Sequence, residues 1–532
     1  MYYLIGGGKI QWNETFRHNG PYFPPLYQKH NIPVLINGQQ VVLSELAEEY
    51  ITLYANYLNT DYIKKPKFNK NFLNDFNKVL PDNLKMNSMD EIQLDDIKNH
   101  IDKLKEKKKN MSKEEKNKVK EYNSEIEKPF KFCIIDGAQQ KVGNYKIEPP
   151  GIFLGRGEHP KLGKIKKRIL PEDVTLNLDK NAPIPIPNVG GNWKKVIELK
   201  DGIWLASWTD NISKKSKYVF TSMESIFKSK SDEEKFDLAR KLKTKIKYIR
   251  GTYLNDLNSS VLVNRQLATA LYLIDNLALR VGGKKNTKEK ADTVGVTSLR
   301  VEHISFLENN VIKLDFLGKD SIKFCKKVQV SPDVFRNLKE FVNEKIKKNQ
   351  LFDKISASNL NDYLNNFMKG LTAKVWRTYN ASNLFQKELN KLNPEKLENL
   401  DESEKIKFLI TFFNQANTAV ALLCNHQKNV STNFSKQIEN IDEKIKKLKK
   451  TKKKSKKEKL QKIKNKIELL KIQKEAKSKM KNVSLGTSKN NYIDPRIIFA
   501  FIKKYDIPED KLFTKTLLSR FEWAKKEKDF KF

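Results

Sequence analysis

Five short stretches of the chain combine a cationic or polar side chain with apolar neighbours. They are Leu-Ala-Leu-Arg-Val-Gly at 277–282, Asp-Phe-Leu-Gly-Lys-Asp-Ser at 315–321, Leu-Thr-Ala-Lys-Val-Trp-Arg-Thr at 371–378, Leu-Cys-Asn-His-Gln at 423–427 and Thr-Ser-Lys-Asn-Asn-Tyr-Ile-Asp-Pro-Arg at 487–496. An arginine in such surroundings is partly buried, and burying a cation is unfavourable unless an anion meets it. Each stretch alone could carry a salt bridge to a local acidic residue. An external anion is the other partner that such a cation could meet.

Other motifs with a known chemistry fail on spacing. In Gly-Glu-His-Pro-Lys-Leu-Gly-Lys-Ile at 157–165, five residues separate the glycines where a P-loop has four, and Ile165 stands where Ser or Thr should bind magnesium. The run Gly-Gly-Gly-Lys at 6–9 lacks the spaced first glycine, and neither HExxH nor GxSxG occurs. Histidine and cysteine are too sparse for a tetrahedral metal cluster. We therefore expect no metal, no ATP and no other cofactor.

These stretches belong to a large and strongly basic chain. It has 532 residues, with 103 Lys and Arg against 64 Asp and Glu, so the formal net charge is +39. A hydrophobic share of 38% supports packed cores, and the length predicts about two to four domains. We expect no membrane span and no secretion signal, and Cys133, Cys325 and Cys424 are too far apart for a disulfide framework. The composition indicates a soluble, intracellular protein whose partner is a polyanion.

Positive charge is concentrated in residues 431–481, which hold 20 Lys and six acidic residues, a net charge of +14. Two apolar series there step by three, four and three residues, and their members are Ile438, Ile441, Ile445 and Leu448, then Leu460, Ile463, Ile467 and Leu470. A polar run at 451–457 separates them. The pattern predicts an antiparallel coiled-coil hairpin with a lysine-rich tip, each arm on the order of 25 Å long. A flexible basic linker is the alternative.

The segments that must position the five stretches differ in their predicted secondary structure along the chain. Residues 32–46 predict a strand, an Asn-Gly turn and a second strand, and residues 130–208 predict mostly strands and turns. Residues 231–426 predict helices interrupted by a strand-rich interval at 293–330. A stretch with charges of both signs, 101–121, predicts an exposed helical connection.

Together, the five stretches resemble the eukaryotic type IB DNA topoisomerase family. The resemblance covers nearly the whole chain and includes Asn-Tyr-Lys-Ile-Glu-Pro-Pro-Gly at 144–151, Gly-Arg-Gly at 155–157, Ala-Asp-Thr-Val-Gly at 291–295 and Ser-Leu-Arg-Val-Glu-His-Ile at 298–304. It implies an α+β multidomain clamp with a mixed α/β cap lobe, a mainly α catalytic lobe with a small β-sheet, an antiparallel coiled-coil linker and a small α C-terminal domain. We expect the chain to begin about where the family's ordered core begins, without its long charged N-terminal extension.

The resemblance implies four parts and a partner. Residues 1–224 would form the DNA-binding cap lobe, with an aromatic arm and helical and β subdomains. Residues 225–428 would form the catalytic core, 429–485 the basic coiled-coil linker and 486–532 the C-terminal domain with a nucleophilic tyrosine. We expect a monomer that encircles double-stranded, supercoiled DNA and binds no membrane. The expected location is the nucleus, with a viral replication site or virion as the alternative.

The resemblance also assigns roles in relaxing positive and negative supercoils. Tyr492 is the nucleophile, which joins the 3′ phosphate and frees a 5′ hydroxyl. Arg280, Arg377 and His426 contact the non-bridging phosphate oxygens, and Lys319 is the general acid for the 5′ oxygen. Physical chemistry agrees, because a phenol with a pKa of about 10 needs nearby guanidinium groups to favour its phenolate at neutral pH. A desolvated lysine near other cations can protonate a leaving alkoxide. His426 could donate through Nε2 or act as a partial general base.

Further residues match the family's DNA contacts and drug pocket. We expect a basic run to face phosphate: Lys161, Lys164, Lys166, Lys167 and Arg168. The other expected DNA contacts are Arg156, His159, Lys285, Lys374, Asn425, Thr487, Ser488 and Lys489. Four residues match positions that line the family's camptothecin pocket, namely Phe153, Arg156, Asp320 and Asn491. We therefore expect camptothecin to slow religation, and we expect a weak preference for a T next to the cut through Lys319.

Two other functions remain open at the level of sequence. A tyrosine site-specific recombinase would share the Arg/Lys/Arg/His/Tyr set, but Lys374 stands three residues before Arg377, where recombinases usually have histidine. A non-catalytic protein could use the charge of +39 simply to coat DNA, although the complete set of five residues argues against it. The enzyme prediction depends on Tyr492 lying close to Arg280 and Arg377 in the folded chain.

Overall fold

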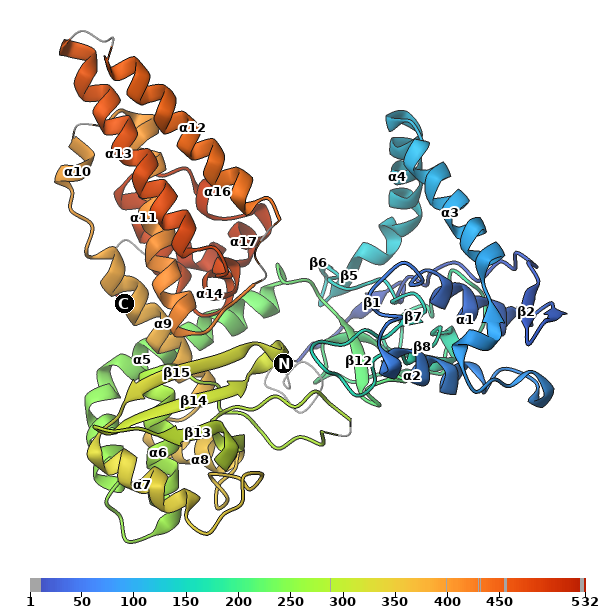
Figure 1. Cartoon of the computed structure of the whole chain (residues 1–532), viewed down its shortest axis with the longest axis horizontal. Helices are drawn as coiled ribbons and strands as arrows, with labels where there is room; N and C mark the ends of the chain where they lie inside the picture. Colours follow the sequence, from blue (N-terminus) through green and yellow to red (C-terminus); the bar gives the residue numbers. More distant parts are fainter. Residues whose placement is uncertain are drawn as a thin grey trace. The chain divides into compact units, whose positions relative to one another are not determined.

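The computed structural model describes residues 11–287, 289–398, 400–428, 430, 432–453, 457–526 and 531–532. The chain is a mixed α+β protein with long helices and several small sheets. It divides into two compact units (Figure 1). The N-terminal unit comprises Met1–Lys228 and Lys285–Asp292, and the C-terminal unit comprises Ser229–Lys284 and Thr293–Phe532.

Short strands build much of the N-terminal unit. One sheet has the order β1 (Phe16–His18), β5 (Phe132–Ile135) and β6 (Ala138–Lys141). A second has the order β10 (Lys195–Ile197), β9 (Thr175–Asn177), β11 (Trp204–Thr209) and β12 (Ser216–Phe220). The smaller sheets contain β3 (Gln39–Val41), β2 (Val34–Ile36) and β4 (Ile92–Gln93), and β7 (Gly151–Ile152) with β8 (Ile165–Lys166). The predicted strands between residues 130 and 208 are thus confirmed.

The predicted hairpin at 32–46 is confirmed as well. β2 pairs with β3 in antiparallel register, and the turn between them is Asn37-Gly38. Both turn residues have positive φ, 49° for Asn37 and 80° for Gly38. A two-residue type I′ turn requires this conformation at both positions, and Asn and Gly adopt it with little strain.

The described part of the N-terminal unit also contains the helices α1 (Glu45–Ala55), α2 (Pro66–Phe76), α3 (Asp95–Asn110) and α4 (Lys113–Glu127). Phe68, Phe72 and Phe76 recur every fourth residue of α2, so they share one face and are fully buried. Figure 1 shows α3 and α4 joined by a sharp bend, and Ser112 caps the start of α4. Most of their side chains are exposed, which confirms the exposed helical connection predicted around 101–121.

In the C-terminal unit, α5 (Ile226–Asp256) and α6 (Leu262–Leu277) precede an antiparallel sheet of order β13 (Ile304–Phe306), β14 (Val311–Leu317) and β15 (Lys323–Gln329). This is the sheet predicted at 293–330. Along β14, Ile312, Leu314 and Phe316 are buried, because alternate residues of a strand face the same side.

Helices α7 (Pro332–Val342), α8 (Ala357–Phe367), α9 (Ala373–Leu389), α10 (Glu395–Glu398) and α11 (Glu402–Leu423) follow the sheet. α9 packs against α6 and α11, and its Trp376 and Phe385 are fully buried. The chain ends with α14 (Leu485–Asn491), α15 (Pro495–Lys504), α16 (Glu509–Leu512) and α17 (Lys515–Arg520). α14 packs against α11. The helix before the basic segment and the helix after it are therefore in contact.

The basic segment contains α12 (Phe434–Lys453) and α13 (Lys457–Lys479), which lie side by side in Figure 1. The Lys474 ammonium pairs with the Asp442 carboxylate across them at 2.6 Å. α13 also packs against α11. By length and composition, α11 is the one helix of the described ranges that could cross a membrane, a run that the sequence analysis did not expect. Of its apolar window, 44% is buried within the protein, against α9, α13 and α14.

Candidate active site

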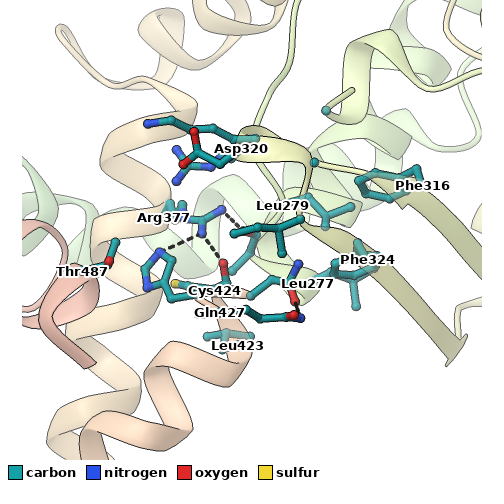
Figure 2. Close-up of a pocket in the computed structure, with 18 of the residues that line it drawn as sticks. Leu277, Leu279, Phe316, Asp320, Phe324, Arg377, Leu423, Cys424, Gln427 and Thr487 are labelled. Carbon is teal, nitrogen blue, oxygen red and sulfur yellow. Dashed lines mark hydrogen bonds between the residues drawn. The ribbon is translucent and has the colours of Figure 1, made fainter. Parts of the chain in front are cut away.

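Four of the five predicted catalytic residues line one cavity of about 150 Å³ in the C-terminal unit (Figure 2). Arg280 follows α6, Lys319 lies in the turn between β14 and β15, Arg377 lies in the second turn of α9, and His426 follows α11. Apolar side chains, among them Leu279, Phe316 and Phe324, form part of the wall. The cavity therefore gathers positive and polar groups in surroundings of low polarity, where electrostatic interactions are strong.

Arg377 is almost fully buried, with 4% of its surface exposed. Its Nη1 donates to the Ala278 carbonyl at 2.6 Å, and its Nη2 donates to the Cys424 carbonyl at 2.5 Å. Nη2 also lies 3.3 Å from His426 Nε2, as the dashed lines of Figure 2 show. Ala278 ends α6 in the left-handed conformation, with φ of 48°. A carbonyl at a helix end has no partner within the helix, so it is free to accept from Arg377.

The His426 ring is neutral at physiological pH. Burial lowers its pKa to about 3, and the charges of Arg377, Arg280 and Lys319 act in the same direction. A guanidinium can only donate, so His426 Nε2 accepts from Arg377 and the proton of the neutral ring is on Nδ1.

Two buried donors beside the cavity have no partner in the described structure. They are Arg377 Nε and His426 Nδ1. Buried polar atoms are nearly always hydrogen-bonded, so such donors indicate a missing ligand. A guanidinium has five N–H groups and the protein supplies three acceptors to Arg377, which leaves two N–H groups for that ligand. An anion such as phosphate fits these donors.

Tyr492 lies directly after α14, and its backbone N–H donates to the Ser488 carbonyl at 2.9 Å. Only 6% of its surface is exposed. The centre of its ring is 5.1 Å from Arg377 Cζ and 5.3 Å from the centre of the His426 ring. The structure thus brings the predicted nucleophile into contact with two of the residues that line the cavity.

Two glycines fix the segment that carries Arg280. Gly282 has φ of 85°, and a Cβ added there would lie 2.7 Å from the backbone of Gly295. This close approach allows the Val296 N–H to donate to the Arg280 carbonyl at 2.9 Å and the Thr297 N–H to donate to the Val281 carbonyl at 2.8 Å. The Arg280 backbone is therefore tied to the segment that leads into the small sheet.

The DNA contacts predicted near Tyr492 differ in their surroundings. Asn425 and Thr487 line the cavity, whereas Ser488 is fully buried and its carbonyl accepts the N–H groups of Tyr492 and Ile493. The Lys489 ammonium donates to the Leu512 carbonyl, and burial lowers the pKa of Lys489.

Three more of the predicted residues lie in the C-terminal unit. Lys374 is exposed on α9. Asp320 lines the cavity in the left-handed conformation, with φ of 67°. Asn491 Nδ2 donates to the Thr487 carbonyl at 3.1 Å. The DNA-contact and drug-pocket roles of all these residues stay predictions.

In the N-terminal unit, most of the predicted phosphate-facing run is paired with acidic residues from distant parts of the sequence. The pairs are Lys161 with Glu289, Lys164 with Asp75 at 3.0 Å, Lys166 with Glu148 at 2.6 Å, and Arg168 with Glu49 at 2.6 Å. Lys167 is exposed. Phosphate would have to compete with these carboxylates, so the role of the run stays a prediction.

The other predicted residues of this unit lie in two places. Phe153, Arg156 and His159 lie around the turn at Gly155, and Lys285 lies in a separate segment. The Phe153 and His159 rings meet edge to face, with their centres 4.8 Å apart. A Cβ at Gly155, which has φ of 64°, would lie 2.6 Å from His159 Cβ, so this turn requires glycine beside Arg156. Lys285 lies in Lys285–Asp292, and burial and the charge of Lys290 lower its pKa.

Sequence reasoning missed the groups that support the site from behind. The buried Asp275 carboxylate accepts from Arg250 Nε at 2.8 Å, Tyr253 Oη at 2.8 Å and Trp376 Nε1 at 3.0 Å. Asp275 therefore links α6, on which it lies, to α5 and α9. It lies three residues before Ala278, whose carbonyl holds Arg377. The sequence shows only that an acidic residue, Asp275, precedes Leu-Ala-Leu-Arg at 277–280. The spacing between Asp275 and its partners does not form a recognisable motif.

Three family models match the chain. Eukaryotic DNA topoisomerase I, DNA binding fragment, matches residues 10–221, the catalytic core of the same enzyme matches 224–483, and the C-terminal topoisomerase domain matches 464–532. The chain belongs to the eukaryotic DNA topoisomerase I family.

Similar relatives include DNA topoisomerase 1 beta of Arabidopsis thaliana, at 41% identity over 98% of this chain and 59% of that protein. DNA topoisomerase 1 of Drosophila melanogaster is 40% identical over 97% of this chain and 54% of its own length. DNA topoisomerase 1 of Homo sapiens is 39% identical over 97% of this chain and 71% of its own length. The chain therefore spans between about half and three quarters of these relatives.

Proposed function

We propose that this protein is a type IB DNA topoisomerase, which relaxes positive and negative supercoils without ATP or metal. The observation that carries the proposal is the cavity lined by Arg280, Lys319, Arg377 and His426, with Tyr492 packed on two of these residues. Its spare buried donors suit a phosphodiester, and the family of the chain agrees with that substrate. The partner we propose is double-stranded DNA, bound by a monomer in the nucleus.

Cleavage begins when the Tyr492 phenol loses its proton to solvent and its oxygen attacks the phosphorus. The new oxygen–phosphorus bond forms as the bond to the 5′ oxygen breaks, and the electron pair of that bond passes to the 5′ oxygen. Lys319 supplies the proton that makes this oxygen a hydroxyl. Arg280, Arg377 and His426 donate to the non-bridging oxygens, whose negative charge grows in the transition state.

Religation is the reverse reaction. The 5′ hydroxyl attacks the phosphotyrosine and the Tyr492 oxygen leaves. Because one phosphodiester replaces another in each direction, no nucleotide is consumed. Between the two steps, the free 5′ end turns about the intact strand and supercoils relax. Neutral His426 fits a donor role here, since a ring with its proton on Nδ1 can donate from that atom.

The architecture implied by this cycle is part of the proposal. A clamp of a cap lobe (1–224), a catalytic core (225–428), a coiled-coil linker (429–485) and a C-terminal domain (486–532) would hold DNA while one strand turns. The antiparallel pair α12 and α13 supports the linker, with its net charge of +14. Its lysines would slow rotation by attraction to phosphates, and more strongly at low salt.

The test is plasmid relaxation in EDTA without nucleotide. We expect the intact chain to relax both positively and negatively supercoiled plasmid. We also expect it to form a denaturant-stable complex in which the protein is joined to the 3′-phosphate end of the broken strand and the other end is a free 5′ hydroxyl. Tyr492→Phe should lose both activities. Tyr505→Phe removes a hydroxyl from the same end of the chain and should retain them. Full relaxation by Tyr492→Phe would overturn the proposal.

A tyrosine recombinase is the second candidate, because it shares the five residue types. Lys374, three residues before Arg377, and the family match along the whole chain favour the topoisomerase. The two differ in assembly and product. A monomer on DNA that relaxes a plasmid without exchanging strands between duplexes supports the topoisomerase, whereas recombinant products from paired sites would support the recombinase.

A further inference from the structure

The backbone around Tyr492 is held by a hydroxyl from another helix. Ser382 lies on α9 and none of its surface is exposed. Its Oγ donates to the Tyr492 carbonyl at 3.0 Å and accepts the Asp494 N–H at 3.0 Å. One side chain therefore bridges the two backbone groups on either side of Ile493, which fixes the direction in which the chain leaves Tyr492.

Charged groups hold the same turn at its two ends. At one end, Lys235 Nζ on α5 donates to the Asn491 carbonyl at 3.1 Å. At the other, the fully buried Asp494 carboxylate accepts from Arg240 Nε at 3.2 Å and from Arg496 Nη2 at 2.9 Å. Lys235 and Arg240 thus secure the turn to α5, and Arg496 secures it to α15, but none of these bonds involves an atom of Tyr492. Ser382 alone among these side chains bonds to a Tyr492 atom.

Ser382 and Arg377 belong to the same helix, five residues apart, which is about 7.5 Å along its axis. Arg377 is fixed by the Ala278 and Cys424 carbonyls and lies over the Tyr492 ring. A single rigid element thus holds both the arginine at the cavity and the backbone of the nucleophile. Their separation is set by helix geometry, and a misplacement of about 1 Å between reacting groups can slow a reaction about 10²-fold.

We propose that Ser382 is a positioning residue, whose hydroxyl holds Tyr492 at the distance from the phosphate that attack requires. The inference rests on the proposed function, in which Tyr492 is the nucleophile. It assigns to α9 a second task beside carrying Arg377, and it predicts a defect in the approach of the nucleophile and not in DNA binding or in protonation of the leaving group.

The test compares Ser382→Ala with Thr378→Val in single-turnover cleavage of a short duplex. Thr378 is fully buried one turn earlier on α9, and its hydroxyl bonds the Lys374 carbonyl of its own helix. We expect Ser382→Ala to cleave about 10- to 100-fold more slowly with DNA affinity unchanged, and Thr378→Val to stay within about twofold of the intact chain. Ser382→Cys, a weak donor, should lie between.

A duplex with sulfur in place of the bridging 5′ oxygen separates positioning from other roles. A thiolate leaves without a general acid, so sulfur should restore cleavage by Lys319→Ala but not by Ser382→Ala. Restoration of Ser382→Ala by sulfur would overturn the inference, and so would equal losses of cleavage, DNA affinity and thermal stability. If Tyr492→Phe is inactive while Ser382→Ala cleaves normally, this inference alone fails. Cleavage by Tyr492→Phe would refute the proposed function.

Discussion

Arg377→Lys removes the planar group at the centre of the site but keeps its charge. Lysine has three N–H donors, and the Ala278 carbonyl, the Cys424 carbonyl and His426 Nε2 already require three. A lysine that satisfied them would have no N–H left for a phosphate, whereas arginine keeps two. The substitution therefore changes the number of donors available to the substrate from two to none, at constant net charge.

The expected loss follows from that count. Removing one donor to a developing oxyanion costs about 10²–10³ in rate, and losses within one site are less than additive. We expect cleavage by Arg377→Lys to fall about 10³- to 10⁴-fold, which corresponds to about 4–5 kcal/mol of transition-state stabilisation. DNA affinity should change little, because binding of the duplex depends mainly on total positive charge.

The assay is single-turnover formation of the covalent complex on a short labelled duplex, with DNA affinity and thermal unfolding measured on the same samples. Arg265→Lys is the matched control, because Arg265 on α6 is held by the Ser259 carbonyl at 2.8 Å and by Glu340, away from the cavity. The control should cleave within about twofold of the intact chain. Cleavage by Arg377→Lys within about tenfold would refute the donor count.

Four further predictions concern protonation, DNA affinity, rotation and drug binding. Because the pKa of His426 is about 3 and not 6.5, its ring should stay neutral to about pH 4 in NMR spectra of the DNA-free protein. Below pH 6.5 the unfolded chain binds a proton there that the folded chain does not, so this group lowers the free energy of unfolding as pH falls toward 3; a titration midpoint near 6.5 would contradict this. Lys167→Ala should reduce the salt dependence of DNA affinity by about one unit of slope and Lys166→Ala by less, because the Lys166 ammonium is paired with Glu148; equal slopes would argue against that pairing in solution. Replacing 434–480 by a short bridge should leave phosphotyrosine formation intact but change the relaxation rate and its salt optimum, whereas loss of phosphotyrosine at every salt concentration would make the segment structural. Camptothecin should slow religation, and unaltered religation in its presence would remove the predicted drug pocket.

The periodicity of apolar residues in the sequence is enough to place several helices and strands. The three-four-three stepping of isoleucine and leucine predicted helices where α12 and α13 lie, and the strand-rich interval at 293–330 contains β13 to β15. These predictions succeed because apolar spacing reports directly on which face of an element is buried. The cationic and histidine side chains that line the cavity were also predicted from sequence, through the family resemblance of the stretches that contain them.

The support for those side chains could not be predicted in the same way. Arg377 is held by main-chain carbonyls, and no residue type marks which carbonyl is free to accept. An acidic partner of the basic run can lie far from it in sequence, as Asp75 does from Lys164, so local charge counting does not show that these cations are paired. Lys489 is a predicted DNA contact, and the sequence around it does not show that its ammonium donates to the Leu512 carbonyl. Each case depends on tertiary packing between distant segments.

The two main-chain carbonyls that hold Arg377 also affect which substitutions the site can accept during evolution. A substitution at position 278 or 424 changes a side chain but leaves the oxygen that Arg377 needs, so other small side chains that fit these buried positions are compatible with function as long as the backbone keeps its path. The contact between Gly282 and Gly295 has the opposite property, because neither position has room for any side chain. Homologues should therefore vary more freely beside the arginine than at this glycine pair, although both sites serve the same cavity.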